Sequence, residues 1–302
     1  MLNQLDACPV CGGRDLSLDF IGRCARRDDG RAWRVDKCAS CSLRFINPQP
    51  DWRELSSYYD AAYEAYEPEH GLQSLEAEIE RARKTGEFRH IPLRPGLRVL
   101  DVGCGGGAFL SVARAVGAEV YGVEPSAAGV ASARAAGLPV FHGELHQFLQ
   151  SAESARRFDV ITSNHVVEHH PAPVDLLKQM ASLLAPDGYL WFAVPNIESR
   201  TAAALKERWH SVDLPFHLMH FTPASMRRAV ERAGLRIRRE YTHSLPSATL
   251  SSLTTLWRQK YLLPRRLSER LSPILGGLAA AHARRMDETG DGEAIIIEAT
   301  PP

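Results

Sequence analysis

The chain has 302 residues, and its 36 lysine and arginine residues balance 36 aspartate and glutamate residues. This balance argues against a chain-wide basic field of the kind that grips nucleic acid or anionic membranes. With 44% hydrophobic and 24% charged residues the composition is that of a globular protein, and about 150 residues per domain suggests two units. The N-terminus lacks the regions of a signal peptide and no run reaches the roughly 18 apolar residues of a membrane span, so we expect a cytoplasmic protein.

Two C-x-x-C pairs, CPVCG and CASC, stand in the first 50 residues with 26 residues between them. Four thiolates at such spacing are the ligand set of a structural zinc site, and a reducing compartment disfavours disulfides. We therefore predict a zinc ribbon over residues 1–50 with a hairpin tip near 26–30 and Cys24 outside the ligand set. The alternative is a redox C-x-x-C or unpaired thiols. The predicted ligands are Cys8, Cys11, Cys38 and Cys41.

Residues 51–90 are predicted to link this ribbon to a second unit. A tyrosine-rich run is followed by apolar residues at helical spacing between 72 and 88, and prolines at 92 and 95 close the segment. We interpret it as a helical linker that covers the ligand site of the second unit. The tyrosines are Tyr58, Tyr59, Tyr63 and Tyr66.

Short apolar runs alternate with helical ones from residue 91 to the C-terminus. Five runs, at 98–103, 118–124, 138–143, 158–166 and 188–196, read as strands with helices between them. This alternation predicts a parallel sheet covered by helices on both faces. A helix at 221–235, a strand at 235–241, a helical insertion at about 243–290 and a strand at 294–299 follow.

The phrase VLDVGCGGG, residues 99–107, places an acid and a run of glycines where a strand gives way to a helix. Glycines let a backbone approach a ligand closely, and a helix N-terminus offers unpaired N–H groups, so we expect a nucleotide-like cofactor. The spacing of Gly103, Gly105 and Ala108 also fits a dinucleotide fingerprint. Asp101 separates the two readings, because an anion there repels a pyrophosphate and suits an ammonium group. Glu124, at the end of the next strand, can accept the hydroxyls of a ribose.

Four phrases in order, VLDVGCGGG, VEPS, FDVITSNHVVEHHPAP and LLAPDGYLWFAVPN, resemble the class I S-adenosylmethionine-dependent methyltransferases over roughly residues 51–302. The resemblance implies an α/β, Rossmann-like, seven-stranded and mostly parallel sheet with an antiparallel last strand, over residues 91–302. The N-terminal segment resembles the zinc-binding head of some methyltransferases from bacterial polysaccharide or secondary-metabolite clusters.

The same resemblance implies where S-adenosylmethionine binds. An acid and the glycines would hold the methionine end, Glu124 the ribose, and the loop after the third strand the adenine, while two residues after the fourth strand flank the sulfonium. The residues implied are Asp101, Gly103, Cys104, Gly105, Glu124, Pro125, Glu144, Leu145, Asn164 and His165.

Several histidines stand where methyl transfer would need a base. A hydroxyl nucleophile must lose its proton, and histidine is suited to that near neutrality. We predict His169 as the base, with His220 as second choice. His165, beside the cofactor, is also a catalytic candidate, and His217 is a further one. His165, Glu168 and His169 also have the i, i+3, i+4 spacing of a divalent-metal site, which is the alternative interpretation.

The predicted activity is methylation of a small molecule, most simply of a hydroxyl on a sugar, glycan or secondary metabolite. The alternatives are an NAD-dependent oxidoreductase, a zinc-ribbon RNA methyltransferase, and an adaptor that only senses the cofactor. Nucleic acid is disfavoured because few aromatic residues alternate with arginine in the ribbon. Apolar and basic residues mixed between 250 and 285 suggest either a peripheral membrane or lipid-linked-substrate contact, or a lid or homodimer contact.

Overall fold

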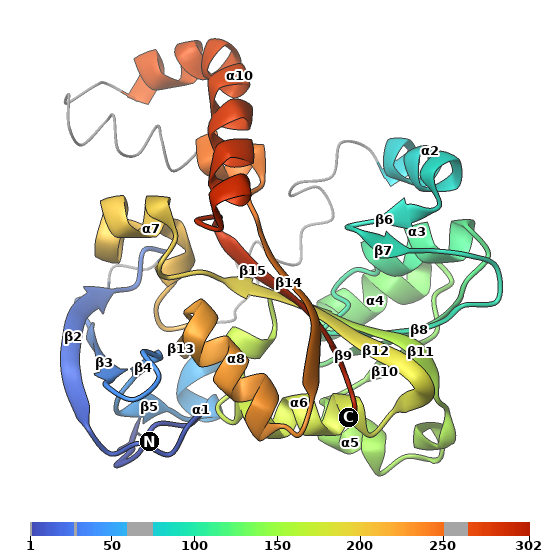
Figure 1. The fold of residues 1–302 in the computed structure, drawn as a ribbon, viewed down its shortest axis with the longest axis horizontal. Helices are drawn as coiled ribbons and strands as arrows, with labels where there is room; N and C mark the ends of the chain where they lie inside the picture. The colour runs from blue at the N-terminus through green and yellow to red at the C-terminus, as the bar shows by residue number, and fades with distance from the viewer. Residues whose placement is uncertain (1, 27–28, 59–74, 251–264) are drawn as a thin grey trace.

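The computed structural model of the protein describes residues 2–26, 29–58, 75–250 and 265–302. Its main sheet has seven strands in the order β10-β9-β8-β11-β12-β15-β14, and β15 runs antiparallel to both neighbours (Figure 1). This confirms the predicted fold class, a mostly parallel sheet whose last strand is antiparallel. The strands are β8 (Arg98–Val102), β9 (Glu119–Glu124), β10 (Val140–His142), β11 (Phe158–Asn164), β12 (Leu184–Pro195), β14 (Arg236–His243) and β15 (Ala294–Thr300).

Helices cover both faces of this sheet. Neighbouring residues of β8 separate the faces, since Val99 packs in one hydrophobic core with Phe109 and Leu100 in another with Leu177. This follows from the two-residue repeat of a strand, which turns successive side chains to opposite sides. Helices α2 (Leu75–Thr85), α3 (Ala108–Ala115) and α4 (Ala127–Ala135) lie on the first face, and α5 (Leu145–Leu149), α6 (Pro173–Ala181) and α8 (Pro223–Arg232) on the second.

A second sheet forms the N-terminal head, which comprises residues 2–50. Its strands are β2 (Leu16–Arg23), β3 (Ala32–Cys38), β4 (Arg44–Ile46) and β13 (Met219–His220), in the order β13-β4-β3-β2. The short pair β1 (Leu2–Asn3) and β5 (Gln49–Pro50) completes it. Since β13 comes from the chain beyond β12, the head sheet is built from two distant parts of the sequence, and head residues such as Phe45 share the core of the second face.

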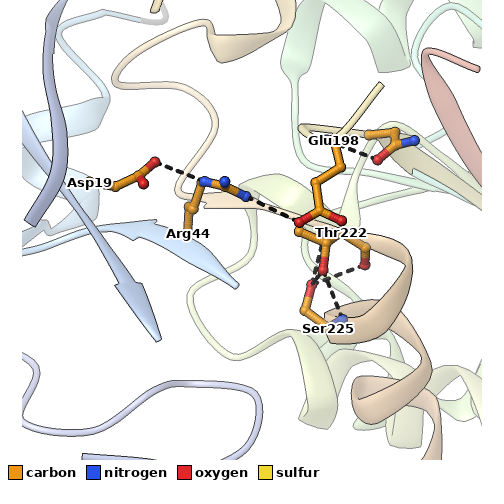
Figure 2. Close-up of polar contacts among 6 residues, drawn as sticks. Asp19, Arg44, Glu198, Thr222 and Ser225 are labelled. Atoms are coloured by element: carbon orange, nitrogen blue, oxygen red, sulfur yellow. Dashed lines mark hydrogen bonds and ion pairs between the residues drawn. The ribbon is translucent and has the colours of Figure 1, made fainter. Parts of the chain in front are cut away.

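An arginine on β4 strengthens this junction. Figure 2 shows Arg44 between Asp19 of β2 and Glu198, which follows β12. Arg44 Nε donates to Asp19 Oδ2 at 2.8 Å, and its Nη1 lies 3.9 Å from Glu198 Oε1. Nearby, the side chains of Thr222 and Ser225 cap the first turn of α8 in a reciprocal pair (Figure 2). The head therefore sits against the start of α8 and the end of β12.

The remaining elements connect these parts. They are α1 (Trp52–Leu55), the hairpin β6 (Glu87–Phe88) and β7 (Ile91–Pro92), α7 (Arg200–Leu205), α10 (Arg265–Thr289) and short 3-10 turns at Ala152–Ala155, Val167–His169, Lys206–Arg208 and His210–Val212. The long α10 projects away from the sheet (Figure 1). Tyr59, Tyr63, Tyr66 and part of the predicted insertion, residues 251–264, lie outside the described residues. Within the described ranges, every helix is too short or too polar to cross a bilayer.

Candidate active site

The glycine-rich loop lies between β8 and α3, at the edge of the sheet where the parallel strands end. Gly103, Gly105 and Gly107 have φ values of 75°, 52° and 81°, a region that side chains other than glycine rarely adopt. A Cβ on Gly103 would lie 2.4 Å from Val166 Cγ2, whereas one on Gly105 would meet nothing within 4 Å. Gly103 is thus packed against the turn that follows β11. The space beside Gly105 is open, so the backbone there is accessible to a ligand.

Asp101 lies in β8 just before this loop and is only 6% exposed. The hydroxyl of Thr162 donates to its Oδ1 at 2.6 Å. Burial raises the pKa of Asp101 to about 7, although the Thr162 hydrogen bond and the Arg89 guanidinium oppose the rise. A buried carboxyl of this kind is a strong partner for a cation, because pairing compensates the cost of ionising it away from water.

Glu124 ends β9 and links the glycine-rich loop to the start of α4. Its Oε2 accepts from Gly105 N and its Oε1 from Ser126 N, both at 2.8 Å. Burial raises its pKa, and the two backbone hydrogen bonds oppose that rise. Each carboxylate oxygen keeps a second lone pair, so the side chain can still accept the hydroxyls of a ribose.

The other residues predicted to bind the cofactor differ in whether their side chains are exposed at this edge of the sheet or buried. Cys104 is in the loop, but its Sγ would lie 2.7 Å from a Cβ on Gly122 and its thiol packs in the core, which leaves only its backbone for a ligand. Leu145 is buried in the opposite core, and the exposed Glu144 caps α5 together with Gln147. Pro125 is exposed and directly follows β9, and Asn164 is half-buried at the end of β11.

A cluster of Glu168, His169 and His217 stands beside the end of β11, and one ligand atom of each lies within 4.8 Å of the others. The rings of His169 and His217 are 4.7 Å apart between centroids and nearly perpendicular. His169 Nδ1 is 2.9 Å from the carbonyl oxygen of Phe216, and His217 Nδ1 is 2.8 Å from that of Ser211. A carbonyl only accepts, so each Nδ1 carries a proton, and in the neutral form of either ring the lone pair is on Nε2.

The acid of this cluster is fully enclosed. Glu168 Oε1 is 3.1 Å from His165 Nδ1, while its Oε2 has no hydrogen-bond partner among the described residues. Burial raises the pKa of Glu168, but the hydrogen bond from His165 and the nearness of His169 and His217 outweigh it and leave the pKa below its usual value. Burial lowers the pKa of His217 well below 6.5. Near neutral pH the cluster therefore contains a carboxylate beside a neutral His217 imidazole.

The other two histidines predicted as catalytic, His165 and His220, lie in different environments. His165 is exposed and contacts the cluster through Glu168. His220 is buried on β13 in the head sheet, where its ring lies 6.1 Å from that of Phe20. Burial lowers the pKa of His220 to about 3, and Arg44 adds to the shift. The structure thus brings His217, rather than His220, to His169. The sequence analysis preferred His220 to His217 as the second candidate, and it is His217 that lies beside His169.

The residues that could hold a divalent metal here differ from those predicted from the sequence. The atoms that converge belong to Glu168, His169 and His217, instead of the i, i+3, i+4 set that includes His165. Two imidazoles and a carboxylate form a donor set that divalent transition metals accept. The cluster therefore offers both a candidate base and a donor set for a divalent cation.

The four cysteines of the head converge as predicted for a metal ligand set. One sulfur of each lies within 4.8 Å of the others, with Cys8 and Cys41 3.6 Å apart and Cys11 and Cys38 3.5 Å apart. In each knuckle the residue four positions after the first cysteine donates its N–H to that cysteine's carbonyl and has a positive φ, 76° at Gly12 and 63° at Ser42. This repeated turn presents both thiols of a pair to one point, which suits tetrahedral zinc.

Comparisons with known proteins agree with this geometry. A family model described as "Methyltransferase domain" matches residues 64–240. The ubiquinone biosynthesis O-methyltransferase of Burkholderia pseudomallei is 27% identical over 197 residues, 62% of this chain and 84% of that protein. The protein of the same name from Actinobacillus pleuropneumoniae is 32% identical over 140 residues, 44% of this chain and 57% of that protein.

Among solved structures, a SAM-dependent methyltransferase from Archaeoglobus fulgidus is 22% identical with a TM-score of 0.49, over 75% of this chain and 94% of that one. A magnesium protoporphyrin IX methyltransferase from Synechocystis, with bound SAH, is 18% identical with a TM-score of 0.44, over 76% and 83%. The family model alone spans more than half of the 302 residues. The chain therefore belongs to the methyltransferase-domain family and is a class I S-adenosylmethionine-dependent methyltransferase.

Proposed function

We propose that this enzyme methylates a hydroxyl oxygen of a small molecule, such as a sugar, a glycan or a secondary metabolite, and that His169 removes the hydroxyl proton. The observation that carries this proposal is the pair of imidazoles whose Nδ1 atoms both face backbone carbonyls, at 2.9 and 2.8 Å. An Nε2 that keeps its lone pair is a general base. The relatives named O-methyltransferase support oxygen as the acceptor atom.

The side chains at the sheet edge divide the work. When bound, S-adenosylmethionine supplies a methyl group on a cationic sulfur. Asp101 would pair with its ammonium end, the backbone at Gly105 would pass beside it, and Glu124 would accept its ribose hydroxyls. Transfer of that methyl group to the acceptor oxygen, with the sulfur as leaving group, would release the hydroxyl proton, which His169 Nε2 would accept. Alignment of these groups supplies most of the rate enhancement in such a displacement.

Glu168 and His217 assist the base. A buried carboxylate next to His169 favours the imidazolium that forms when the proton arrives, because opposite charges attract strongly where water is excluded. His217 packs edge-on against the His169 ring and limits its orientation. We further propose that Cys8, Cys11, Cys38 and Cys41 hold a structural zinc ion, supported by their convergence.

A methyl-transfer assay with labelled S-adenosylmethionine tests the activity. The purified protein is offered a panel of hydroxylated acceptors, comprising nucleotide sugars, polyols and phenols, alongside amine acceptors of matched size. We expect label on a hydroxyl oxygen, located by mass spectrometry of the product. Transfer only to amines, or none to any acceptor while the cofactor binds, would contradict the proposal.

Cofactor affinity is expected to depend on pH through Asp101. Its pKa of about 7 means that the carboxyl is mostly neutral at pH 6 and mostly ionised at pH 8. Only the ionised form pairs with an ammonium group, so affinity is lost as the pH falls through that pKa. Calorimetry with S-adenosylhomocysteine should show binding about tenfold tighter at pH 8 than at pH 6.

Asp101→Asn provides the control for this measurement. It keeps the size of the side chain but removes the charge, and it should bind weakly with an affinity that is the same at both pH values. NAD should not bind to the native protein in the same experiment. Equal affinity of the native protein for S-adenosylhomocysteine at pH 6 and pH 8 would show that Asp101 does not hold the ammonium end.

A further inference from the structure

We propose that the head positions His169 and His217 for catalysis, and that it does so through Arg26 and a chain segment that Arg26 contacts. This inference depends on the proposed function, in which His169 is the base. The segment is residues 213–220, which supply His217 and also the carbonyl oxygen of Phe216 that orients His169. The segment lies between the head on one side and Glu168 and His169 on the other. The head would then be part of the catalytic apparatus instead of an appended binding module.

Contacts along the segment show how closely the head holds it. At its far end β13 pairs with β4, and the N–H of Ile46 donates to the carbonyl of Leu218 at 3.0 Å. In its middle, Leu214 packs over Gly22 of β2, where an added Cβ would lie 2.5 Å from Leu214 Cδ1. Both sides of Phe216 and His217 in the sequence are therefore fixed to head strands.

Arg26, just after β2, holds the near end of the segment. Its Nε and Nη2 donate to the two carboxylate oxygens of Asp213 at 2.9 and 2.8 Å, a bidentate pair. The same guanidinium stands 5.1 Å from the centre of the Phe216 ring. Tyr58, which follows the head in sequence, meets that ring edge-on at 6.2 Å. Arg26 thus contacts both the start of the segment and the residue whose carbonyl orients His169.

Asp213 makes this near end sensitive to Arg26. Its φ of 31° lies in the left-handed region, which a residue other than glycine occupies at a cost. Its carbonyl accepts the N–H of His217 at 3.0 Å, so the turn passes directly to the histidine backbone. Without the bidentate pair, the turn can relax, and both the Phe216 carbonyl and the His217 ring can shift from His169.

The expected consequence is a loss of rate with little loss of fold. The Arg26 side chain is 37% exposed, although that of Asp213 is only 8% exposed, and an ion pair with one solvated partner contributes modestly to stability. A displacement of catalytic groups by about 1 Å, in contrast, can cost about 100-fold in rate. Arg26→Gln should therefore lower kcat by about 10- to 100-fold, with acceptor KM and affinity for S-adenosylhomocysteine changed less than about twofold.

Three measurements on the full-length protein separate positioning from mere folding. Nitrogen-15 NMR of labelled histidine should show that His169 loses its preference for the Nδ1–H form in Arg26→Gln. Asp213→Asn should give the same changes, and the double variant should be no worse than either single one. Arg23→Gln, an exposed arginine of the same hairpin that contacts the Gly30 carbonyl, is the matched control and should leave kcat unchanged.

The outcomes distinguish this inference from the proposed function. If the native protein methylates no hydroxyl, the proposed function fails, while the tautomer measurement still reports on the positioning. If native kcat and the His169 tautomer persist in Arg26→Gln and Asp213→Asn, the inference is wrong. Should Arg26→Gln fail to fold, Asp213→Asn alone decides, and an equal loss of kcat in Arg23→Gln would also overturn the inference.

Discussion

Replacing His169 with alanine is expected to lower kcat for hydroxyl methylation by about 10²- to 10⁴-fold, the usual contribution of a general base. The ring nitrogen that would accept the proton is removed, while Asp101 and Glu124, the residues proposed to bind the cofactor, belong to other strands. Affinity for S-adenosylhomocysteine should therefore stay within about twofold of the native value. Steady-state kinetics with the best acceptor from the panel, together with calorimetry, measure both quantities.

His282→Ala is the matched control, since it makes the same substitution on the projecting helix α10. It should retain native kinetics. Near-native kcat in His169→Ala would show that another group takes the proton. Activity that disappears on chelation and returns with added Mn²⁺ or Mg²⁺ would contradict the role as a base and assign the cluster to a divalent cation.

Removal of the zinc ion proposed for the head is expected to destabilise the whole protein. Structural zinc in small domains contributes a large share of the folding free energy. The head is small, and without the metal site it has little hydrophobic core of its own. Cys38→Ser removes a fully buried thiol of the proposed ligand set. We expect it to lose the metal and to lower Tm by about 10 °C or more, since each kcal/mol corresponds to about 2–4 °C at this size.

Elemental analysis and thermal unfolding check this prediction together. Native protein should contain about one equivalent of zinc, and less than about half would count against the site. Cys24→Ser is the control, because Cys24 is buried in the head but stands outside the converging set. It should keep its zinc and most of its Tm. Because β13 pairs with β4, the loss in Cys38→Ser should appear in one shared transition.

The parts of this protein that sequence alone predicted are those encoded over short distances. Asp101, Gly103 and Gly105 lie within five residues, and a strand, a tight turn and a helix in immediate succession leave them few alternative arrangements. Each C-x-x-C turn is likewise closed by its own backbone hydrogen bonds. Such features follow from local conformational preferences, so the sheet class, the glycine loop and the cysteine knuckles could be named from residue order.

The tertiary structure decided which distant residues meet. His169 and His217 are 48 positions apart, and the two-residue strand β13 places His220 in the head sheet while His217 faces His169. The inward turn of the Cys104 thiol depends equally on β9, whose Gly122 leaves room for it. Residue order was enough to predict the glycine loop and the turn within each C-x-x-C pair, because neighbouring residues constrain one another's backbone. The pairing of His169 with His217 and the docking of the head depend on packing between remote segments, which no local preference encodes.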